Sequence, residues 1–177
     1  RFCEGSNLIK ILDFGDVPLA GGFLKEEQFS EECFYPLEIC YCTDCTLVQV
    51  RNVVSGEVLF KNYFYFSSSI NTLVEHFADF AKETKDCFLK SLGQPLVVEI
   101  GCNDGVLLKP LHALGVKCIG VDPATNVVES INMPEIMVIN DFFTEKVALQ
   151  IRDHYGKADA VLSSYSFAHI DDMIDVV

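Results

Sequence analysis

The sequence predicts an α/β fold, in which a parallel sheet with helices on both faces follows a small β-rich module. From residue 96 onward, continuous apolar runs alternate with helical segments, which is typical of a parallel sheet buried on both faces. The first 50 residues instead carry short apolar runs separated by Gly and Pro, and they hold five of the eight cysteines. We therefore expect a module over residues 1–55, a connecting segment with an amphipathic helix over 56–92, and the sheet domain over 93–177.

The individual elements follow from local signals. In the module, turn residues separate the apolar runs, and we expect short strands at 11–15, 18–22, 35–39 and 47–50. Apolar residues at helical spacing predict one helix over 72–92, which Gly93 and Pro95 end. In the sheet domain we expect strands at 96–100, 116–121, 136–140 and 158–164, and helices at 106–114, 124–131 and 143–155. This alternation is Rossmann-like, and because such sheets generally have more strands, we expect the chain to be a fragment.

The charge balance excludes several classes of partner. The chain has 13 Lys and Arg against 26 Asp and Glu, a formal net charge of −13. A field of that sign repels phosphate backbones and anionic lipid, so we expect neither nucleic acid nor a membrane surface as partner. No apolar run approaches the roughly 20 residues of a membrane span, and the opening residues do not form a secretory signal. We expect a cytoplasmic location.

The cysteines near the N-terminus predict a metal site. Cys42 and Cys45 have the C-x-x-C spacing that lets two thiolates approach one tetrahedral Zn²⁺, and Cys3 is the natural third ligand. The fourth ligand is missing from this set, and Cys33 or Cys40 could supply it. A zinc ion held by four protein ligands has no open position, so its role is structural. The alternative is that these cysteines are reduced thiols without metal.

A glycine turn between the first strand of the sheet domain and its helix predicts a ligand site. Gly101 and Gly105 bracket this turn, and ligands of such sheets bind at the carboxyl ends of the strands. Asp122 ends the next strand, where an acidic side chain can accept hydrogen bonds from ribose hydroxyls. The alternative is a turn that merely closes a strand–helix corner.

The acidic residues at this turn distinguish between two cofactors. A dinucleotide requires G-x-G-x-x-G, but Asn103 stands at the middle glycine and Asp104 stands where the phosphates would lie. Glu99 and Asp104 instead suit a cofactor that carries an ammonium and a sulfonium group. After the third strand, Asp141 can accept a hydrogen bond from the adenine amino group and Phe142 can cover the ring. The pattern favours S-adenosylmethionine.

At these positions the chain resembles the S-adenosylmethionine-dependent C-methyltransferases that act on nucleotide-linked keto-deoxysugars. Two runs are specific in combination, Glu-Ile-Gly-Cys-Asn-Asp-Gly at 99–105 and Tyr-Phe-Tyr-Phe-Ser-Ser at 63–68. Other matching pieces are Cys3-Glu4-Gly5-Ser6, Val17-Pro18-Leu19-Ala20, Tyr35-Pro36-Leu37, Cys42-Thr43-Asp44-Cys45-Thr46-Leu47-Val48-Gln49, Val121-Asp122-Pro123, Asp141-Phe142-Phe143 and Ala168-His169-Ile170.

The resemblance implies a zinc-binding module, a central cofactor domain of the class I methyltransferase fold, and a C-terminal domain that also binds sugar. It implies zinc ligands at Cys3, Cys42 and Cys45, and sugar-facing residues at Tyr63 and His169. The implied cofactor pocket consists of Glu99, Gly101, Asp104, Gly105, Asp122, Asp141 and Phe142. The chain departs from the family in lacking its first zinc cysteine, and it ends before the family's Tyr-x-Glu-His segment, where we expect the general base.

These residues lead to a mechanistic hypothesis. A carbon beside a ketone becomes nucleophilic once a base removes its proton, and the enolate oxygen then needs a hydrogen-bond donor. Tyr63 suits that donor or a proton carrier, and His169 could bond the nucleotide-sugar substrate or share proton transfer. We expect a C-methyltransferase whose fragment is inactive alone. Two other classes stay open, a non-catalytic protein that binds zinc and S-adenosylmethionine, and a nicotinamide-dependent oxidoreductase.

Overall fold

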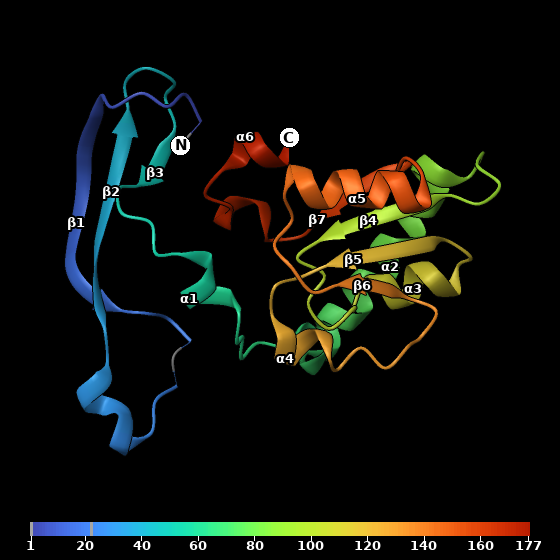
Figure 1. Ribbon diagram of the computed structural model, residues 1–177, viewed down its shortest axis with the longest axis horizontal. Helices are drawn as coiled ribbons and strands as arrows, with labels where there is room; N and C mark the ends of the chain where they lie inside the picture. Colours follow the sequence, from blue (N-terminus) through green and yellow to red (C-terminus); the bar gives the residue numbers. More distant parts are fainter. Residues whose placement is uncertain (1, 22) are drawn as a thin grey trace.

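The chain folds into two sheets that lie beside each other and are joined by a partly helical connection (Figure 1). The structure is a computed structural model that describes residues 2–21 and 23–177. The first sheet belongs to the N-terminal module and is antiparallel, and the second is parallel and carries the buried core. Among the described residues, no helix has the length and apolar character that crossing a membrane requires.

The N-terminal sheet has three antiparallel strands in the order β1-β2-β3, namely β1 (Leu8–Pro18), β2 (Phe34–Cys42) and β3 (Val48–Val50). The prediction of short strands was wrong for β1 and β2, which have 11 and 9 residues. Charged side chains interrupt their apolar pattern, but solvent reaches most of β1, so this sheet tolerates the charges. No strand forms at 19–21, because Pro18 lacks a backbone N–H and ends β1; Gly22 lies outside the described residues.

The connection holds the predicted amphipathic helix, and three short elements precede this helix in the chain. The helix is α2 (Asn71–Thr84), and it continues directly into the π-helical turn η3 (Lys85–Leu89), which the sequence did not reveal. Phe77, Ala81 and Leu89 are buried against the parallel sheet. The short elements are η1 (Glu26–Glu31) within the module, and α1 (Gly56–Phe60) and η2 (Ser67–Ser69) before α2.

The parallel sheet confirms the predicted Rossmann-like alternation. Its order is β6-β5-β4-β7, with strands β4 (Leu96–Ile100), β5 (Lys117–Val121), β6 (Met137–Ile139) and β7 (Ala160–Ser163). The helices between them are shorter than predicted: α3 (Leu108–Ala113), α4 (Thr125–Val128) and α5 (Glu145–Tyr155). The chain ends in η4 (Phe167–His169) and α6 (Met173–Val176). The chain crosses from β6 past β5 and β4 to reach β7, so the carboxyl end of β4 is a topological switch point.

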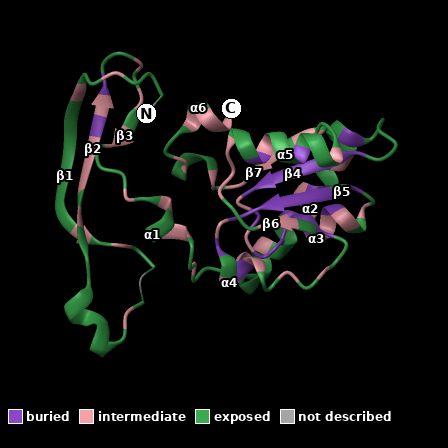
Figure 2. Cartoon of the chain, in the orientation of Figure 1, coloured by how far each residue is buried: buried purple, intermediate pink, exposed green. Residues whose placement is uncertain are grey.

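Two apolar clusters cover the two faces of this sheet (Figure 2). On one face, α2, η3 and α3 pack through Phe77, Leu89 and Leu111 against Val97 and Cys118. On the other, Val147 and Ile151 of α5 pack against apolar side chains of β4 and β5, which are Leu96, Val98, Ile119 and Val121. Burial on both faces explains why these strands read as continuous apolar runs in the sequence.

The closest packing between strand and turn occurs at Gly120 in β5. A Cβ atom there would lie 2.5 Å from Cys102 Sγ and 2.6 Å from Leu108 Cδ1. We expect Gly120→Ala to lower the free energy of unfolding by about 1–3 kcal/mol through overpacking, measured by urea denaturation. Gly93→Ala is the matched control, because a Cβ at Gly93 meets no atom within 4 Å. Equal stability of the two variants would contradict the packing.

Candidate functional site

The glycine turn lies at the carboxyl end of the central strand β4. Gly101 and Gly105 have φ angles of +71° and +76°, in the left-handed region that glycine adopts without strain. A Cβ on Gly101 would lie 2.1 Å from Ser166 Oγ, so this position also needs glycine for space. The Gly101 backbone N–H donates to the Val121 carbonyl oxygen at 2.8 Å, which ties the turn to the end of β5.

Three carboxyl groups are buried beside this turn. Glu99, Asp104 and Asp122 have exposed fractions of 2%, 2% and 7%. Asp122 accepts hydrogen bonds from the backbone N–H groups of Asn103 at 2.8 Å and Ala124 at 2.9 Å. Among the described residues, Glu99 Oε2 and Asp104 Oδ1 have no hydrogen-bond partner. Buried acceptors without donors are rare in proteins, and here they mark a place for a donor or a cation from outside the chain.

Burial and the neighbouring acids raise the proton affinity of Glu99 in particular. Burial raises the pKa of Glu99 well above its usual value, and the charges of Asp122 and Asp104 raise it further. Burial also raises the pKa of Asp122, against the two backbone N–H groups that lower it. A positively charged ligand would relieve this repulsion. The buried carboxyl groups therefore fit the ammonium and sulfonium groups of S-adenosylmethionine.

The segment 63–69, here called the edge segment, lies across the carboxyl edge of the sheet and is held there by asparagines. Asn126 of α4 accepts a hydrogen bond from the Tyr63 backbone N–H at 2.9 Å and donates to the Tyr63 carbonyl oxygen at 2.7 Å. Asn103 accepts from the Ser67 N–H and donates to the Tyr65 carbonyl oxygen, both at 2.9 Å. Asn126 was not among the predicted site residues, because no local signal in the sequence indicates this pairing.

The edge segment also contacts the buried acids directly. The Ser68 backbone N–H donates to Asp104 Oδ2 at 3.0 Å, which leaves only the other oxygen of that carboxylate free. Asp104 is therefore held from two sides, by its own turn and by the edge segment. The two runs that carry the family resemblance, at 63–68 and 99–105, thus form one joint structure.

The predicted adenine-side residues follow β6 at the same edge. Asp141 is exposed, and its Oδ1 accepts a hydrogen bond from the backbone N–H of Phe142 at 2.8 Å. The ring of Phe142 is half-buried and lies against the start of α1, where a Cβ on Gly56 would be 2.8 Å from Phe142 Cε1. Asn140, which the sequence analysis left without a role, donates to the Asp122 carbonyl oxygen at 2.9 Å and so links the ends of β5 and β6.

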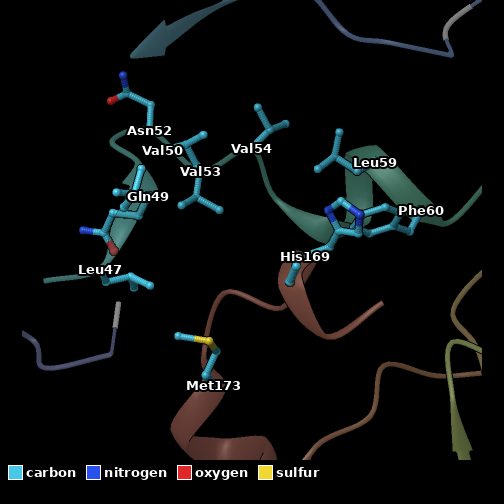
Figure 3. A pocket seen from close by; sticks show the side chains of 12 residues that line it. Leu47, Gln49, Val50, Asn52, Val53, Val54, Leu59, Phe60, His169 and Met173 are labelled. Atoms are coloured by element: carbon cyan, nitrogen blue, oxygen red, sulfur yellow. The ribbon is translucent and has the colours of Figure 1, made fainter. Parts of the chain in front are cut away.

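The two predicted sugar-facing residues both lie next to Phe60. The ring centroids of Tyr63 and His169 are each 6.0 Å from that of Phe60. His169 and Phe60 line a cleft of about 440 Å³ between the end of the N-terminal sheet and the segment after β7 (Figure 3). Tyr63 is half-buried beside Phe60 and is not among the residues that line this cleft. The other lining residues are Leu47, Val48, Gln49, Val50, Asn52, Val53, Val54, Leu59, Ala168 and Met173.

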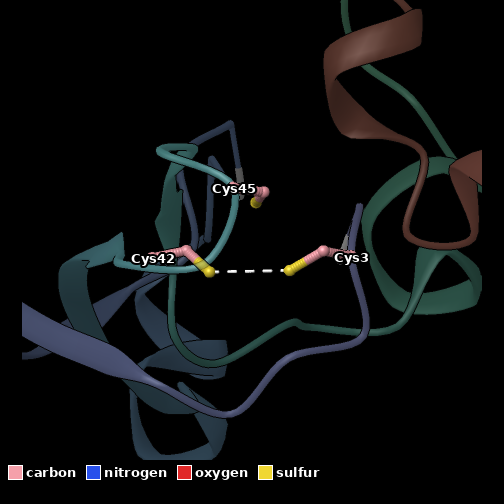
Figure 4. A group of neighbouring side chains, drawn as sticks. All are labelled: Cys3, Cys42 and Cys45. Atoms are coloured by element: carbon pink, nitrogen blue, oxygen red, sulfur yellow. Dashed lines mark hydrogen bonds between the residues drawn. The ribbon is translucent and has the colours of Figure 1, made fainter.

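The three predicted zinc ligands converge at the end of the N-terminal sheet (Figure 4). The Sγ atoms of Cys3, Cys42 and Cys45 all lie within 4.8 Å of one another, and those of Cys3 and Cys42 are 3.6 Å apart. Backbone N–H groups of Cys45 and Asp44 lower the pKa of Cys42 and so favour its thiolate form. Free thiols in this arrangement fit a thiolate metal site such as one for zinc.

The two alternative cysteines lie elsewhere. Cys40 is fully buried, and its Sγ accepts a hydrogen bond from Arg51 Nε at 3.3 Å. Cys33 is exposed and its thiol lies 3.6 Å from the Glu31 carbonyl oxygen. Within the part of the chain that the structure describes, neither joins the group of three.

Fold and site together define a Rossmann-like domain of the class that methyltransferases use, with a cysteine metal module before it. A family model described as "Methyltransferase domain" matches residues 72–177, and one described as "Putative zinc binding domain" matches residues 1–60. The chain belongs to this family of methyltransferase domains, which implies the use of S-adenosylmethionine.

Among curated relatives, the chain is 32% identical to the C-methyltransferase NovU of Streptomyces niveus over 181 residues, covering 100% of this chain and 42% of the relative. It is 29% identical to a ubiquinone biosynthesis O-methyltransferase of Azorhizobium caulinodans over 104 residues, covering 58% of this chain and 39% of the relative. The chain thus spans about two fifths of the length of each. A solved structure described as a "Putative methyltransferase from antibiotic biosynthesis pathway" of Anabaena variabilis overlaps 56% of this chain and 41% of its own, with 12% identity and a TM-score of 0.37.

The cysteine group leads to a prediction about metal content. We expect the purified chain to hold about one zinc ion, and Cys42→Ala to lose most of it, because a site needs all of its thiolates for tight binding. Zinc is measured by atomic emission after gel filtration. Cys33→Ala is the control, because its thiol lies outside the group, and it should keep the zinc. Zinc retained in Cys42→Ala, or absent from the native chain, would contradict the site.

The raised pKa of Glu99 leads to a prediction about stability. A carboxyl group whose pKa is raised by folding contributes stability that is fully present below its ordinary value of 4.5 and is lost as pH rises through the folded value. We expect Glu99→Gln to melt above the native chain at about pH 8 and to show a flatter pH dependence from about pH 5 upward. Glu75→Gln, an exposed position on α2, is the control. An unchanged pH profile in Glu99→Gln would refute the prediction.

Proposed function

We propose that the chain is the metal- and cofactor-binding part of a C-methyltransferase that acts beside the ketone of a nucleotide-linked keto-deoxysugar. The observation that carries the proposal is the group of buried acids at the glycine turn, two of whose oxygens lack a donor. Such a site suits a cationic cofactor and opposes a pyrophosphate. The similarity to a C-methyltransferase spans the whole of this chain and 42% of that relative, whereas the similarity to an O-methyltransferase covers only 58% of the chain, and this difference supports carbon as the acceptor.

In this proposal the chain's own residues bind and orient the cofactor. Glu99 and Asp104 offer their free carboxyl oxygens to the cationic groups, and Gly101 and Gly105 allow the close approach of the backbone. Asp122, at the end of β5, accepts hydrogen bonds from the ribose hydroxyls. Asp141 accepts a hydrogen bond from the adenine amino group, and Phe142 covers the adenine ring. When bound, S-adenosylmethionine supplies a methyl group carried by a sulfonium sulfur. After transfer of the methyl group, this sulfur is left as a neutral thioether.

The acceptor in this proposal lies on the side of Phe60. Tyr63 donates a hydrogen bond to the enolate oxygen or carries a proton, and His169 bonds the sugar in the cleft that it lines. The apolar residues of the cleft exclude water from a carbanion-like centre that water would protonate. Removal of the proton from carbon is assigned to a base outside this chain, so the chain alone binds the cofactor without turnover.

Calorimetric titration with S-adenosylhomocysteine, and with NADH as comparison, tests the proposal. We expect S-adenosylhomocysteine to bind and NADH not to bind, because Asp104 occupies the place where the phosphates of NADH would lie. Asp122→Asn should weaken binding at least about tenfold, since a hydrogen bond to a charged group contributes about 1.5–3 kcal/mol. Asp79→Asn, on the exposed face of α2, is the matched control and should bind as the native chain does.

The outcomes separate the remaining functions. Binding of NADH alone would replace the proposal with a nicotinamide-dependent oxidoreductase. Methyl transfer to a keto-sugar nucleotide by this chain alone would contradict the assignment of the base to residues outside it. Cofactor binding in the longer protein without methyl transfer to any keto-sugar would favour a binding or regulatory role instead.

A further inference from the structure

Two asparagine side chains hold the edge segment as a neighbouring strand would. The amide of Asn126 bonds both backbone groups of one residue, the Tyr63 N–H at 2.9 Å and the Tyr63 carbonyl oxygen at 2.7 Å. The amide of Asn103 bonds the Ser67 N–H and the Tyr65 carbonyl oxygen, both at 2.9 Å. Each amide thus acts once as acceptor and once as donor, as a paired strand residue does. Tyr63 and Tyr65 lie outside any helix or strand, so these bonds fix their backbone.

Both asparagines are attached to the carboxyl group of Asp122. The Asn103 backbone N–H donates to Asp122 Oδ2 at 2.8 Å, and the Ala124 N–H donates to Asp122 Oδ1 at 2.9 Å. The helix α4, which carries Asn126, begins directly after Ala124. Asp122 therefore fixes the backbone from which both amides reach the edge segment.

The strength of this attachment depends on the charge of Asp122. Burial raises the pKa of this carboxyl group, and a hydrogen bond to an ionised carboxylate is about twice as strong as one to a neutral acceptor. In the proposed function the ribose hydroxyls donate to Asp122, and added donors favour its ionised form. A carboxylate has about four acceptor positions, so the hydroxyls do not displace the two backbone N–H groups. A bound cofactor thus strengthens the bonds that hold Asn103 and Ala124.

The other end of this connection is the ring of Tyr63. Because Asn126 bonds both the N–H and the carbonyl oxygen of Tyr63, it fixes the two peptide groups that flank the Cα atom. The ring centroid lies 6.0 Å from that of Phe60, which lines the cleft together with His169. The direction in which the Tyr63 ring points therefore depends on Asn126.

We propose that Asn103 and Asn126 are positioning residues that couple cofactor binding at Asp122 to the placement of Tyr63 on the acceptor side. This inference rests on the proposed function. The coupling is reciprocal: the cofactor strengthens the hold on the edge segment, and a fixed edge segment strengthens cofactor binding by the same factor. Tyr63 is thus held most firmly when the methyl donor is in place.

Hydrogen exchange measured by mass spectrometry, with and without S-adenosylhomocysteine, tests the inference on the 177-residue chain. We expect the bound compound to slow amide exchange over residues 63–69 about five- to tenfold in the native chain. In Asn126→Ala and in Asn103→Gly this slowing falls below about twofold, and the affinity measured by calorimetry falls by the factor that is lost. Glycine is chosen at position 103 because the φ angle there is +50°.

Two further variants separate positioning from general stabilisation. Asn126→Asp keeps the shape and the acceptor but loses the donor to the Tyr63 carbonyl oxygen, so it should behave as Asn126→Ala does. Asn132→Ala, at an exposed position after α4, is the matched control and should keep the native slowing and affinity. A merely structural role of the two amides would change exchange equally with and without the compound and would also speed exchange in β4, which we expect to stay native.

The outcomes keep the two proposals apart. If S-adenosylhomocysteine binds the native chain but does not slow exchange over residues 63–69, the inference is overturned and the proposed function stands. The same holds if Asn126→Ala and Asn103→Gly keep the native slowing and affinity. If the compound does not bind the native chain, both proposals fail.

Discussion

The burial of three carboxyl groups at one edge of a sheet, in a chain of net charge −13, is the constraint on which the rest of the structure depends. A buried carboxylate without donors destabilises a fold by several kcal/mol unless it is protonated or paired. Asp122 accepts hydrogen bonds from two backbone N–H groups, whereas burial and the neighbouring acids raise the pKa of Glu99. In the function proposed above, the turn binds a cation, and its empty form is the less stable one.

The edge segment relieves part of this cost and links the two halves of the site. Its backbone donates to Asp104 through Ser68 and pairs with Asn103 and Asn126, so it is fixed over the acids. The same segment positions Tyr63 beside Phe60, whose other neighbour, His169, lines the cleft. The positions proposed for cofactor and acceptor are thus connected through hydrogen bonds between side chains and backbone and through the ring contacts of Phe60.

How much the sequence could predict depended on burial. Strands β4 and β5 were predicted to within one residue, because burial on both faces leaves an unbroken apolar run. The length of β1 was missed, because an exposed sheet gives no such pattern. C-x-x-C spacing predicted two members of the cysteine group, Cys42 and Cys45, and the structure shows that Cys40 bonds Arg51 instead of joining them. The hydrogen bonds between Asn126 and Tyr63 have no local signal, because they join segments that are distant in sequence.

The N-terminal sheet shows why its cysteines matter to folding. Among its described residues, only Cys40 and Cys42 are buried, while Ile9, Ile11 and Phe14 of β1 are more than half exposed. So few buried side chains cannot offset the conformational entropy of ordering some 50 residues. A small module in this position gains stability from a metal, because binding energy at preorganised thiolates becomes folding energy. Since Gly56 at the start of α1 lies against the ring of Phe142, a metal in this module would stabilise not only the sheet but also the contact with the segment after β6.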